Sequence, residues 1–386
     1  VPIESTDIDG LVSFSLEQNI DLVVVGPEGP LVMGVADKLM SVGIDVFGPK
    51  MRAARLEGSK AFTKDFLARH NIPTARYETF FEVEAALEYV RANGAPIVIK
   101  ADGLAAGKGV IVAATVEEAE QAVRFMLEEN AFGDAGAKVV IEEFLTGEEA
   151  SFIAIVDGID ILPLATSQDH KTRDDGDKGP NTGGMGAYSP APVITPEVHD
   201  RIMSEVMLPT ARGMQTEGAR YRGFLYAGLM IDAGGQPRVI EFNCRFGDPE
   251  TQPVLARLKS DLVDLCLRAC GGSLAGATAD WDPRASLGIV TASGGYPGSY
   301  TKGAIISGLD RNFGPDVKVF HAGTIADDGS IVTSGGRVLC TVALGDNVTE
   351  AQERAYEAVA GIEWEGAFYR HDIGYRAVAR EQTSSI

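Results

Sequence analysis

Residues 100–109, KADGLAAGKG, place glycines between two lysines directly after the apolar run PIVI. Glycines let backbone N–H groups approach phosphate oxygens because no Cβ atom interferes, and the lysines supply positive charge. Only three residues separate Gly103 from Gly107, whereas a Walker A loop has four. Gly109 follows Lys108, where that loop has a hydroxyl residue for magnesium. The pattern excludes a Walker A loop and predicts a hairpin-like flap over a triphosphate; the alternative is a plain flexible turn.

A second group of polar residues lies in RVIEFNCRFGD, residues 238–248, which begins as a predicted strand. Side chains alternate along a strand, so one face is expected to carry three polar residues, Glu241, Asn243 and Arg245. The opposite face is expected to place Ile240, Phe242 and Cys244 in the core. A carboxylate and an amide oxygen suit a hard cation such as Mg²⁺ that also binds phosphates. An arginine can hold a carboxylate or phosphate through two hydrogen bonds. The alternative is a solvated polar face, and Asp232 is assigned to the adjacent hairpin turn.

Weaker signals come from residues 141–149, IEEFLTGEE, which include a predicted strand end. This segment can offer backbone groups at Glu143 and Leu145 to an adenine edge, and the Glu149 carboxylate to a ribose. An acidic surface turn fits the same residues equally well. Lys60 lies near the start of a predicted helix. Without other residues to place it in a site, it is interpreted as a lysine exposed to solvent.

The long polar segment at residues 166–190 contains Asp169, His170 and Lys171, and then the run GGMG at residues 183–186. A connection of this length inside a compact enzyme is usually a binding loop or disordered. We interpret it as a substrate loop, although a histidine in a polar loop is more often a plain surface residue. No spacing of Ser, His, Asp or Cys requires covalent catalysis.

The composition restricts the partners of the chain. Its 386 residues carry a formal net charge of −21, which repels nucleic-acid phosphates. Any nucleotide site must therefore concentrate positive charge locally. Neither a bilayer-length apolar run nor a signal peptide is evident, so we expect a cytoplasmic protein with no membrane partner. The four cysteines lack zinc-ligand spacing and are expected to be buried thiols: Cys244, Cys266, Cys270 and Cys340.

The elements that position these residues alternate between strand and helix. Apolar runs at residues 21–25 and 43–47 each end in Gly-Pro and flank a predicted helix over residues 31–40, as in a doubly wound α/β unit. A further helix is expected to begin at Ser59. About residues 76–144, two helices on a small sheet predict a mobile lid.

Two helix starts follow from capping patterns. Thr115 and Glu118 form a predicted capping box in the lid segment. The part of the chain after about residue 281 alternates short β runs with Gly-Gly turns, and its clearest helix is predicted to start at Thr349, with Gln352 as the matching box residue.

Several of these blocks together resemble the phosphoribosylamine–glycine ligases, a family within the ATP-grasp superfamily. ADGLAAGKGV, IEEFLTGEE and IEFNCRFGDPETQP occur in the order typical of ATP-grasp ligases. Five further blocks are specific to the family: VGPEGPL, GSKAFTKDF, ATSQDHK, GPNTGGMGAYSP and GGRVLC, starting at residues 25, 58, 165, 179 and 335. The resemblance extends over essentially the whole chain. It implies an α/β ATP-grasp fold with a doubly wound domain at 1–57, an ATP-grasp domain at 58–275 and a small β-rich domain at 276–386.

The resemblance also implies a reaction and a set of residues. ATP, glycine and 5-phosphoribosylamine would give ADP, phosphate and glycinamide ribonucleotide through glycyl phosphate, with Mg²⁺ or Mn²⁺. ATP is assigned to Lys60, Lys100, Gly103, Gly107, Lys108, Gly109, Glu142, Glu143, Phe144, Leu145 and Glu149. The metal is assigned to Glu241 and Asn243, and catalysis to Arg245, Lys171 and Asp169. The substrates are assigned to Glu28, His170, Gly183, Gly184, Met185, Gly186 and Asp248. A monomer is expected.

One departure and two alternatives remain at this point. The family begins with a strand and a Gly-x-Gly-Gly-Arg-Glu-His turn, whereas this chain starts near the expected third strand, so we expect a truncated first domain. One alternative is another ATP-grasp ligase, such as a carboxylase or a dipeptide ligase. The other is a nucleotide-binding protein that has lost catalysis.

Overall fold

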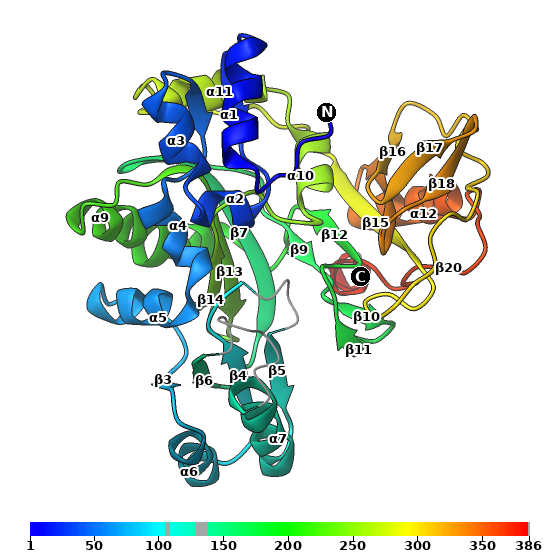
Figure 1. Cartoon of the computed structure of the whole chain (residues 1–386). Coiled ribbons are helices and arrows are strands. Elements are labelled where there is room, and N and C mark those ends of the chain that lie inside the picture. The colour runs from blue at the N-terminus through cyan, green and yellow to red at the C-terminus, as the bar shows by residue number, and fades with distance from the viewer. Residues whose placement is uncertain (105–108, 129–136, 385–386) are drawn as a thin grey trace. The chain divides into compact units, whose positions relative to one another are not determined.

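The computed structural model describes residues 1–104, 109–128 and 137–384, and Figure 1 shows the course of the chain. The chain divides into two compact units. Unit 1 comprises Val1–Pro163, Val193–Phe246 and Asp261–Thr278, and unit 2 comprises Leu164–Pro192, Gly247–Ser260 and Ala279–Ile386. Because each unit is assembled from separate stretches, the units do not coincide with the three consecutive domains predicted above, and that division stays a prediction.

Unit 1 opens with alternating helices and strands. Its first elements are α1 (Ile8–Glu17), β1 (Leu22–Val24), α2 (Glu28–Val32), α3 (Val35–Ser41), β2 (Asp45–Phe47) and α4 (Met51–Gly58). β1 and β2 pair in parallel, as the two Gly-Pro-closed runs predict, with Val23 opposite Val46. The single helix predicted over residues 31–40 is instead two helices. Gly34 separates them because it adopts a φ of +89°, a conformation that glycine adopts without strain.

The segment predicted as a lid folds around a core of its own (Figure 1). Its elements are β3 (Tyr77–Phe80), α6 (Val83–Asn93), β4 (Ile97–Ala101), β5 (Val110–Ala113), α7 (Val116–Leu127) and β6 (Val139–Glu143). The sheet has the order β3-β6-β4-β5, and Ile99 and Ile141 are fully buried in it. The predicted capping box is confirmed. Thr115 Oγ1 accepts a hydrogen bond from Glu118 N at 3.2 Å, and the Glu118 carboxylate accepts one from Ala114 N at 2.8 Å.

The central sheet of unit 1 carries the predicted metal strand. Its order is β14-β13-β7-β8, from β7 (Glu148–Asp157), β8 (Asp160–Pro163), β13 (Arg222–Ile231) and β14 (Pro237–Asn243). The same unit contains α5 (Lys60–Arg69), α8 (Pro196–Arg201), the π-helical turn η2 (Ile202–Met207), α9 (Leu208–Thr216) and α11 (Leu262–Cys270). Asp232 occupies the β13–β14 turn as predicted, because its Oδ1 accepts hydrogen bonds from Gly234 N and Gln236 N.

A β-bulge changes the alternation along β14. Glu241 pairs with Gly228. Val239 pairs with Leu229, the next residue on β13, so Ile240 is an extra residue in β14. Val239 is therefore fully buried and Ile240 only half-buried. The expectation that Ile240 faces the core is wrong, because alternation resumes only after the bulge.

Unit 2 is built on an antiparallel sheet of order β16-β19-β15-β12-β9, with β20 also paired to β15. Its strands are β9 (Gln168–Asp169), β12 (Gly186–Ser189), β15 (Ala285–Ser293), β16 (Val317–His321), β19 (Arg337–Gly345) and β20 (Ala367–Phe368). Two hairpins add β10 (Thr172–Asp174) with β11 (Lys178–Asn181), and β17 (Thr324–Asp327) with β18 (Ser330–Thr333). The helices are α10 (Thr251–Arg257), α12 (Val348–Val359) and α13 (Tyr375–Ser384). The polar segment at 166–190 thus contains four short strands, which its Gly- and Asp-rich composition conceals.

The start of α12 differs from the prediction. Asn347 is the N-cap, and its Oδ1 accepts a hydrogen bond from Glu350 N at 2.8 Å. The Glu350 carboxylate in turn accepts one from Asp346 N, which completes a capping box two residues before the predicted start. Thr349 instead donates through its hydroxyl to Glu381 of α13.

Candidate functional site

Lys100 of β4 lies at the centre of a buried group of charges in unit 1. Its side chain is 4% exposed, and Nζ lies 2.9 Å from Glu142 Oε1. Nζ also donates to the carbonyl oxygen of Ile240 at 3.2 Å. Ile240 is the bulged residue of β14, so the bulge connects the lid sheet to the metal strand through Lys100.

Lys64 is the second buried lysine in this group, and the sequence reading missed it. Its Nζ lies 2.8 Å from Glu142 Oε2 and donates to Thr74 Oγ1 at 2.7 Å. Burial lowers the pKa of Lys64 to about 8; the Glu142 carboxylate opposes this shift and the positive charge of Lys100 adds to it. The signal available in the sequence was the spacing from Lys60, since residues four apart lie on one helix face.

Lys60 is the first residue of α5, and its Nζ donates to the Gly103 carbonyl at 3.0 Å. Burial lowers its pKa, the Glu241 carboxylate raises it and Lys100 lowers it. The start of the predicted flap is fixed to the same helix, because Asp102 accepts hydrogen bonds from Ser59 Oγ at 2.9 Å and from Ala61 N at 2.7 Å. Gly109 follows the gap in the described residues, and the predicted ligands Gly107 and Lys108 lie outside the described residues.

The tip of β14 presents the two predicted metal ligands. Glu241 and Asn243 are half-buried, whereas Phe242 and Cys244 are in the core. With the Asn243 amide oriented to satisfy its hydrogen bonds, Nδ2 donates to Glu57 Oε1 at 3.0 Å and to Phe242 O at 3.3 Å. In this orientation Oδ1 lies on the opposite side of the amide, which faces hydrogen-bond donors. A carboxylate and an amide oxygen on one strand face are hard ligands, so these residues fit a magnesium-type cation.

Arg245, just after β14, lies between two carboxylates. Its Nε is 3.1 Å from Glu28 Oε2 and one terminal nitrogen is 3.2 Å from Glu57 Oε1. Glu57 was not singled out from the sequence. Burial raises its pKa to about 7, while Arg245 and the backbone N–H of Cys244 lower it and Glu28 raises it further. Two acids therefore hold the guanidinium that the sequence assigned to substrate.

The segment assigned to adenine and ribose joins β6 to β7. The Glu143 N–H donates to the Arg76 carbonyl at 2.9 Å, and the Glu143 carboxylate lies 2.8 Å from Arg76 Nε. Phe144 is exposed, and Leu145 and Glu149 are half-exposed. Because the Glu143 N–H is already bonded to Arg76, just before β3, an adenine contact there depends on the Glu143 carbonyl.

In unit 2, the predicted substrate loop is pinned along its length. Asp169 pairs with Ala187 in the sheet, and the Lys171 carbonyl accepts hydrogen bonds from Thr182 N and Oγ1 at 2.7 and 2.8 Å. Met185 is fully buried in the core of unit 2, and its backbone N–H and carbonyl are bonded to His170 O and Val290 N, so the structure does not offer it to a ligand. The Gly186 carbonyl accepts a hydrogen bond from the backbone N–H of His170.

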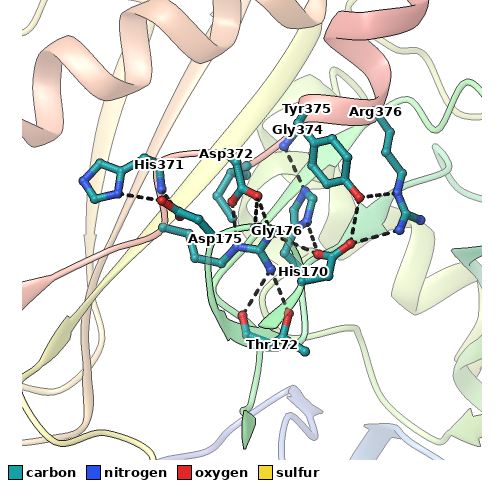
Figure 2. Close-up of polar contacts among 12 residues, drawn as sticks. His170, Thr172, Asp175, Gly176, His371, Asp372, Gly374, Tyr375 and Arg376 are labelled. Carbon is teal, nitrogen blue, oxygen red and sulfur yellow. Dashed lines mark hydrogen bonds and ion pairs between the residues drawn. The ribbon is translucent and has the colours of Figure 1, made fainter. Parts of the chain in front are cut away.

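His170 is buried, hydrogen-bonded through one ring nitrogen and close to an acid at the other (Figure 2). Nε2 accepts a hydrogen bond from Gly374 N at 2.8 Å, and Nδ1 faces Asp177 Oδ1 at 3.8 Å. Nε2 is thus unprotonated and the proton lies on Nδ1. Burial lowers the pKa of His170, with Arg370 adding to the effect and Asp177 opposing it. The ring therefore holds neighbouring segments together.

Arg370 completes this network, which we call the C-terminal clamp: His170, Thr172, Asp177, Arg370, Asp372, Tyr375 and Arg376 (Figure 2). The Arg370 side chain is 0% exposed. It donates to both Asp372 carboxylate oxygens, to Asp177 Oδ1 at 3.0 Å, and to the carbonyl and hydroxyl of Thr172. The clamp joins residues 370–376 to the substrate loop on both sides of β10.

The glycine-rich run at 183–186 is held by a second arginine side chain. Arg337 donates to the Gly183 carbonyl and pairs with Asp248, while Gly183 N donates to Tyr296 Oη at 2.9 Å. Gly184 has a φ of +103°, and an added Cβ would lie 2.2 Å from Pro249 Cδ, so only glycine fits there. Asp248, predicted to bind substrate, is thus placed to orient Arg337.

Lys64 yields a pH-dependent prediction for stability. Between the folded-state pKa of about 8 and the ordinary value of 10.5, the unfolded chain holds a proton that the folded chain has released. Stability rises with pH wherever the unfolded state binds more protons. The free energy of unfolding of the wild type, from urea titration followed by circular dichroism, should rise relative to that of Lys64→Met from pH 8 to 10.5. Lys38→Met, at a residue whose side chain is 53% exposed, is the control. A constant or falling difference contradicts the assignment.

The clamp yields a stability prediction for unit 2. Arg370→Met removes the buried guanidinium that Asp372 and Asp177 share, leaving Asp372 without its partner, and should lower the free energy of unfolding by about 3 kcal/mol. Both tryptophans, Trp281 and Trp364, lie in unit 2, so fluorescence-detected urea unfolding reports on that unit. Arg173→Met, in the same loop but with an exposed pair, should cause little change. Equal effects of the two substitutions would contradict a structural role for Arg370.

Comparisons with known proteins agree along the whole chain. Models of the N domain, the ATP-grasp (A) domain and the C domain of phosphoribosylglycinamide synthetase match residues 1–57, 58–251 and 286–376. Phosphoribosylamine–glycine ligases from Vibrio parahaemolyticus and Salmonella typhimurium are each 65% identical, over 99% of this chain and 89% of the relative.

Solved structures give the same family. A phosphoribosylamine–glycine ligase from Thermotoga maritima has 35% identity and a TM-score of 0.83, covering 97% of this chain and 89% of that chain. The biotin carboxylase domain of a Hydrogenobacter thermophilus 2-oxoglutarate carboxylase has 19% identity and a TM-score of 0.73, covering 94% and 79%, and shows the fold alone. The predicted α/β ATP-grasp fold is thus confirmed, and the chain belongs to the phosphoribosylglycinamide synthetase family of ATP-dependent ligases.

Proposed function

We propose that this chain joins glycine to 5-phosphoribosylamine with ATP, giving glycinamide ribonucleotide, ADP and phosphate through glycyl phosphate, a step of purine synthesis. The observation that carries the proposal is the meeting of the buried lysines with the tip of β14 in unit 1. Lys100 contacts the β14 bulge, and the charge of Glu241 acts on Lys60. Phosphoryl transfer needs positioning and charge neutralisation rather than an enzyme nucleophile.

Lys60 and Lys100 hold the triphosphate in this proposal. Glu142 orients Lys100 through their ion pair, and Lys64 binds the other oxygen of the same carboxylate. The segment from Glu143 to Glu149 binds adenosine. In a chain with a net charge of −21, these lysines supply the local positive charge that an anionic nucleotide requires.

Glu241 and Asn243 would hold Mg²⁺ or Mn²⁺. A bound divalent cation would neutralise charge on the β- and γ-phosphates. The support is the pair of hard oxygen ligands on one strand face, with Lys60 beside them. The choice between the two metals is left to measurement of each metal's affinity.

Arg245 holds the glycine carboxylate in the proposed reaction, while Glu57 and Glu28 keep its guanidinium in place. A carboxylate oxygen attacks the γ-phosphorus, the bond from that phosphorus to the β,γ-bridging oxygen breaks, and ADP leaves. The amine of phosphoribosylamine then attacks the carbonyl carbon of glycyl phosphate. The carbon–oxygen bond to phosphate breaks, and the amine loses a proton. Exclusion of water protects the acyl phosphate until the amine attacks.

The acceptor half of the reaction is assigned to unit 2, with Asp169 as the base for the amine proton and Lys171 as the cation for the phosphate. Residues 183–186 line the acceptor site in this proposal, and Glu28 is assigned to the ribose. In this proposal His170 and Asp248 do not touch the substrate but hold neighbouring residues in place, because each is hydrogen-bonded to other residues of unit 2.

The wider setting follows from the same proposal. We expect a monomer in the cytoplasm with no nucleic-acid partner, as the charge indicates. Among residues 1–104, 109–128 and 137–384, no helix combines the length and apolar character needed to cross a bilayer.

The direct test measures ADP and glycinamide ribonucleotide from the wild type with ATP, Mg²⁺, glycine and fresh phosphoribosylamine. Glu241→Gln should lower kcat by about 100-fold or more, because charge stabilisation at the phosphates is lost. Arg245→Met should lower kcat/KM for glycine by about 100-fold, with a smaller effect on the KM for ATP. Glu120→Gln, which breaks a surface pair in the lid, should leave all constants within about twofold. ADP release by the wild type that ignores both glycine and the acceptor would refute the proposal.

A further inference from the structure

Glu57 is a buried acid that contacts three consecutive residues at the end of β14. It lies in the last turn of α4, and its side chain is 6% exposed. Oε2 accepts a hydrogen bond from Cys244 N at 2.7 Å. Oε1 lies 3.2 Å from a terminal nitrogen of Arg245 and, with the Asn243 amide oriented to satisfy its hydrogen bonds, accepts one from Asn243 Nδ2 at 3.0 Å. Both oxygens are therefore committed to the strand end that carries a proposed metal ligand and the proposed glycine-binding arginine.

Packing alone does not account for an acid at this position. Removing a carboxylate from water is costly unless it is paired and hydrogen-bonded, and an apolar side chain would fill the same space between α4 and β14 at no such cost. What an apolar residue lacks is acceptors. Each partner of Glu57 donates to it, so the acid fixes the direction of three donors.

The amide of Asn243 is the donor for which direction matters most. An asparagine can turn either its oxygen or its NH₂ group toward a ligand, and only the oxygen binds a cation. Because the Glu57 carboxylate accepts at Oε1, it draws Nδ2 toward itself and leaves Oδ1 on the opposite side of the amide. Ligand orientation by an outer hydrogen-bond partner commonly changes metal affinity by about 10- to 100-fold.

We propose that Glu57 is a positioning residue that sets the amide of Asn243 with its oxygen toward the cation and, through the same carboxylate, holds Arg245 beside it. The inference rests on the proposed metal role of Asn243. One acid thus links the metal ligand to the arginine that binds glycine, so that γ-phosphate and glycine carboxylate are held by a single rigid strand end.

Glu28 offers a matched comparison within the same unit. It also pairs with Arg245, at 3.1 Å from Nε, and no contact from it to Asn243 or Cys244 is recorded among the described residues. Glu28→Gln and Glu57→Gln each remove one negative charge next to Arg245. Only Glu57→Gln presents an NH₂ group that can face the Asn243 amide and turn it.

The test measures Mn²⁺ binding by electron paramagnetic resonance in the presence of a non-hydrolysable β,γ-imido ATP analogue, so that turnover is not needed. Glu57→Gln should weaken Mn²⁺ binding by about 10- to 100-fold, whereas Glu28→Gln should leave it within about threefold. Asn243→Asp alone sets two carboxylates against each other and should also weaken binding.

A polarity swap separates positioning from a general structural effect. In Glu57→Gln/Asn243→Asp the glutamine amide can donate to the aspartate while its oxygen still accepts from Cys244 N, and the second aspartate oxygen faces the cation. Mn²⁺ binding should return to within about threefold of the wild type, a non-additivity expected only for residues that interact directly. If Glu57→Gln does not fold, the comparison of Asn243→Asp with the double variant tests the same coupling.

Two results would overturn the inference: wild-type Mn²⁺ affinity in Glu57→Gln, or a double variant no better than Asn243→Asp alone. Failure of the proposed function gives a different result. In that case the wild type binds no Mn²⁺ with the analogue, or Asn243→Ala binds it unchanged. Thermal unfolding of each variant, compared with the wild type, confirms that affinities are measured on folded protein.

Discussion

Lys64, Lys100 and Glu142 place two positive charges and one negative charge where their side chains are only 3–4% exposed. Charges taken out of water destabilise a protein unless they are paired with good geometry. Here each carboxylate oxygen of Glu142 binds one lysine, so a net positive charge remains after pairing. Such a charge is stabilised further when an anion binds nearby. The rest of unit 1 is arranged around this group, since α5, β4, β6 and the bulge of β14 each supply one of its members or partners.

The same arrangement connects the lid to the metal strand. Lys100 belongs to the lid sheet but donates to Ile240 of β14, and Asp102 at the start of the flap accepts hydrogen bonds from the start of α5. Just after the end of β14, Glu57 and Glu28 hold Arg245. The residues proposed to bind nucleotide, cation and glycine are thus linked through contacts to one strand rather than through a flexible loop. Sites built on regular elements keep their geometry better than sites built on loops.

Much of the fold and several site residues could be predicted from local patterns. The apolar run before Lys100, the Thr115 capping box and the turn role of Asp232 depend on residues within a few positions of one another. The family blocks gave the fold, which the comparisons confirm. Lys100 and Glu142 are seen in contact with each other. The assignment of the individual site residues to ATP, metal and substrate remains part of the proposal.

What local patterns could not give depends on distant partners. Glu57 and Cys244 are 187 residues apart in the chain, and Arg370 meets Thr172 across 198 residues, so neither contact leaves a trace in sequence spacing. The bulge at Ile240 arises from pairing with β13 and has no signature in β14 itself. Lys64 of α5 is identified as a buried group only once Glu142 of β6 is seen beside it.

The central claim is that the glycine carboxylate attacks the γ-phosphate within this site. The most direct measurement uses glycine labelled with ¹⁸O in both carboxylate oxygens and follows the inorganic phosphate by mass spectrometry during turnover with ATP and phosphoribosylamine. Because an acyl phosphate breaks at its carbon–oxygen bond, the account predicts that each phosphate released carries one ¹⁸O from glycine. Unlabelled phosphate, formed at the same rate as glycinamide ribonucleotide, would show that the carboxylate never bonded to phosphorus and would contradict the account.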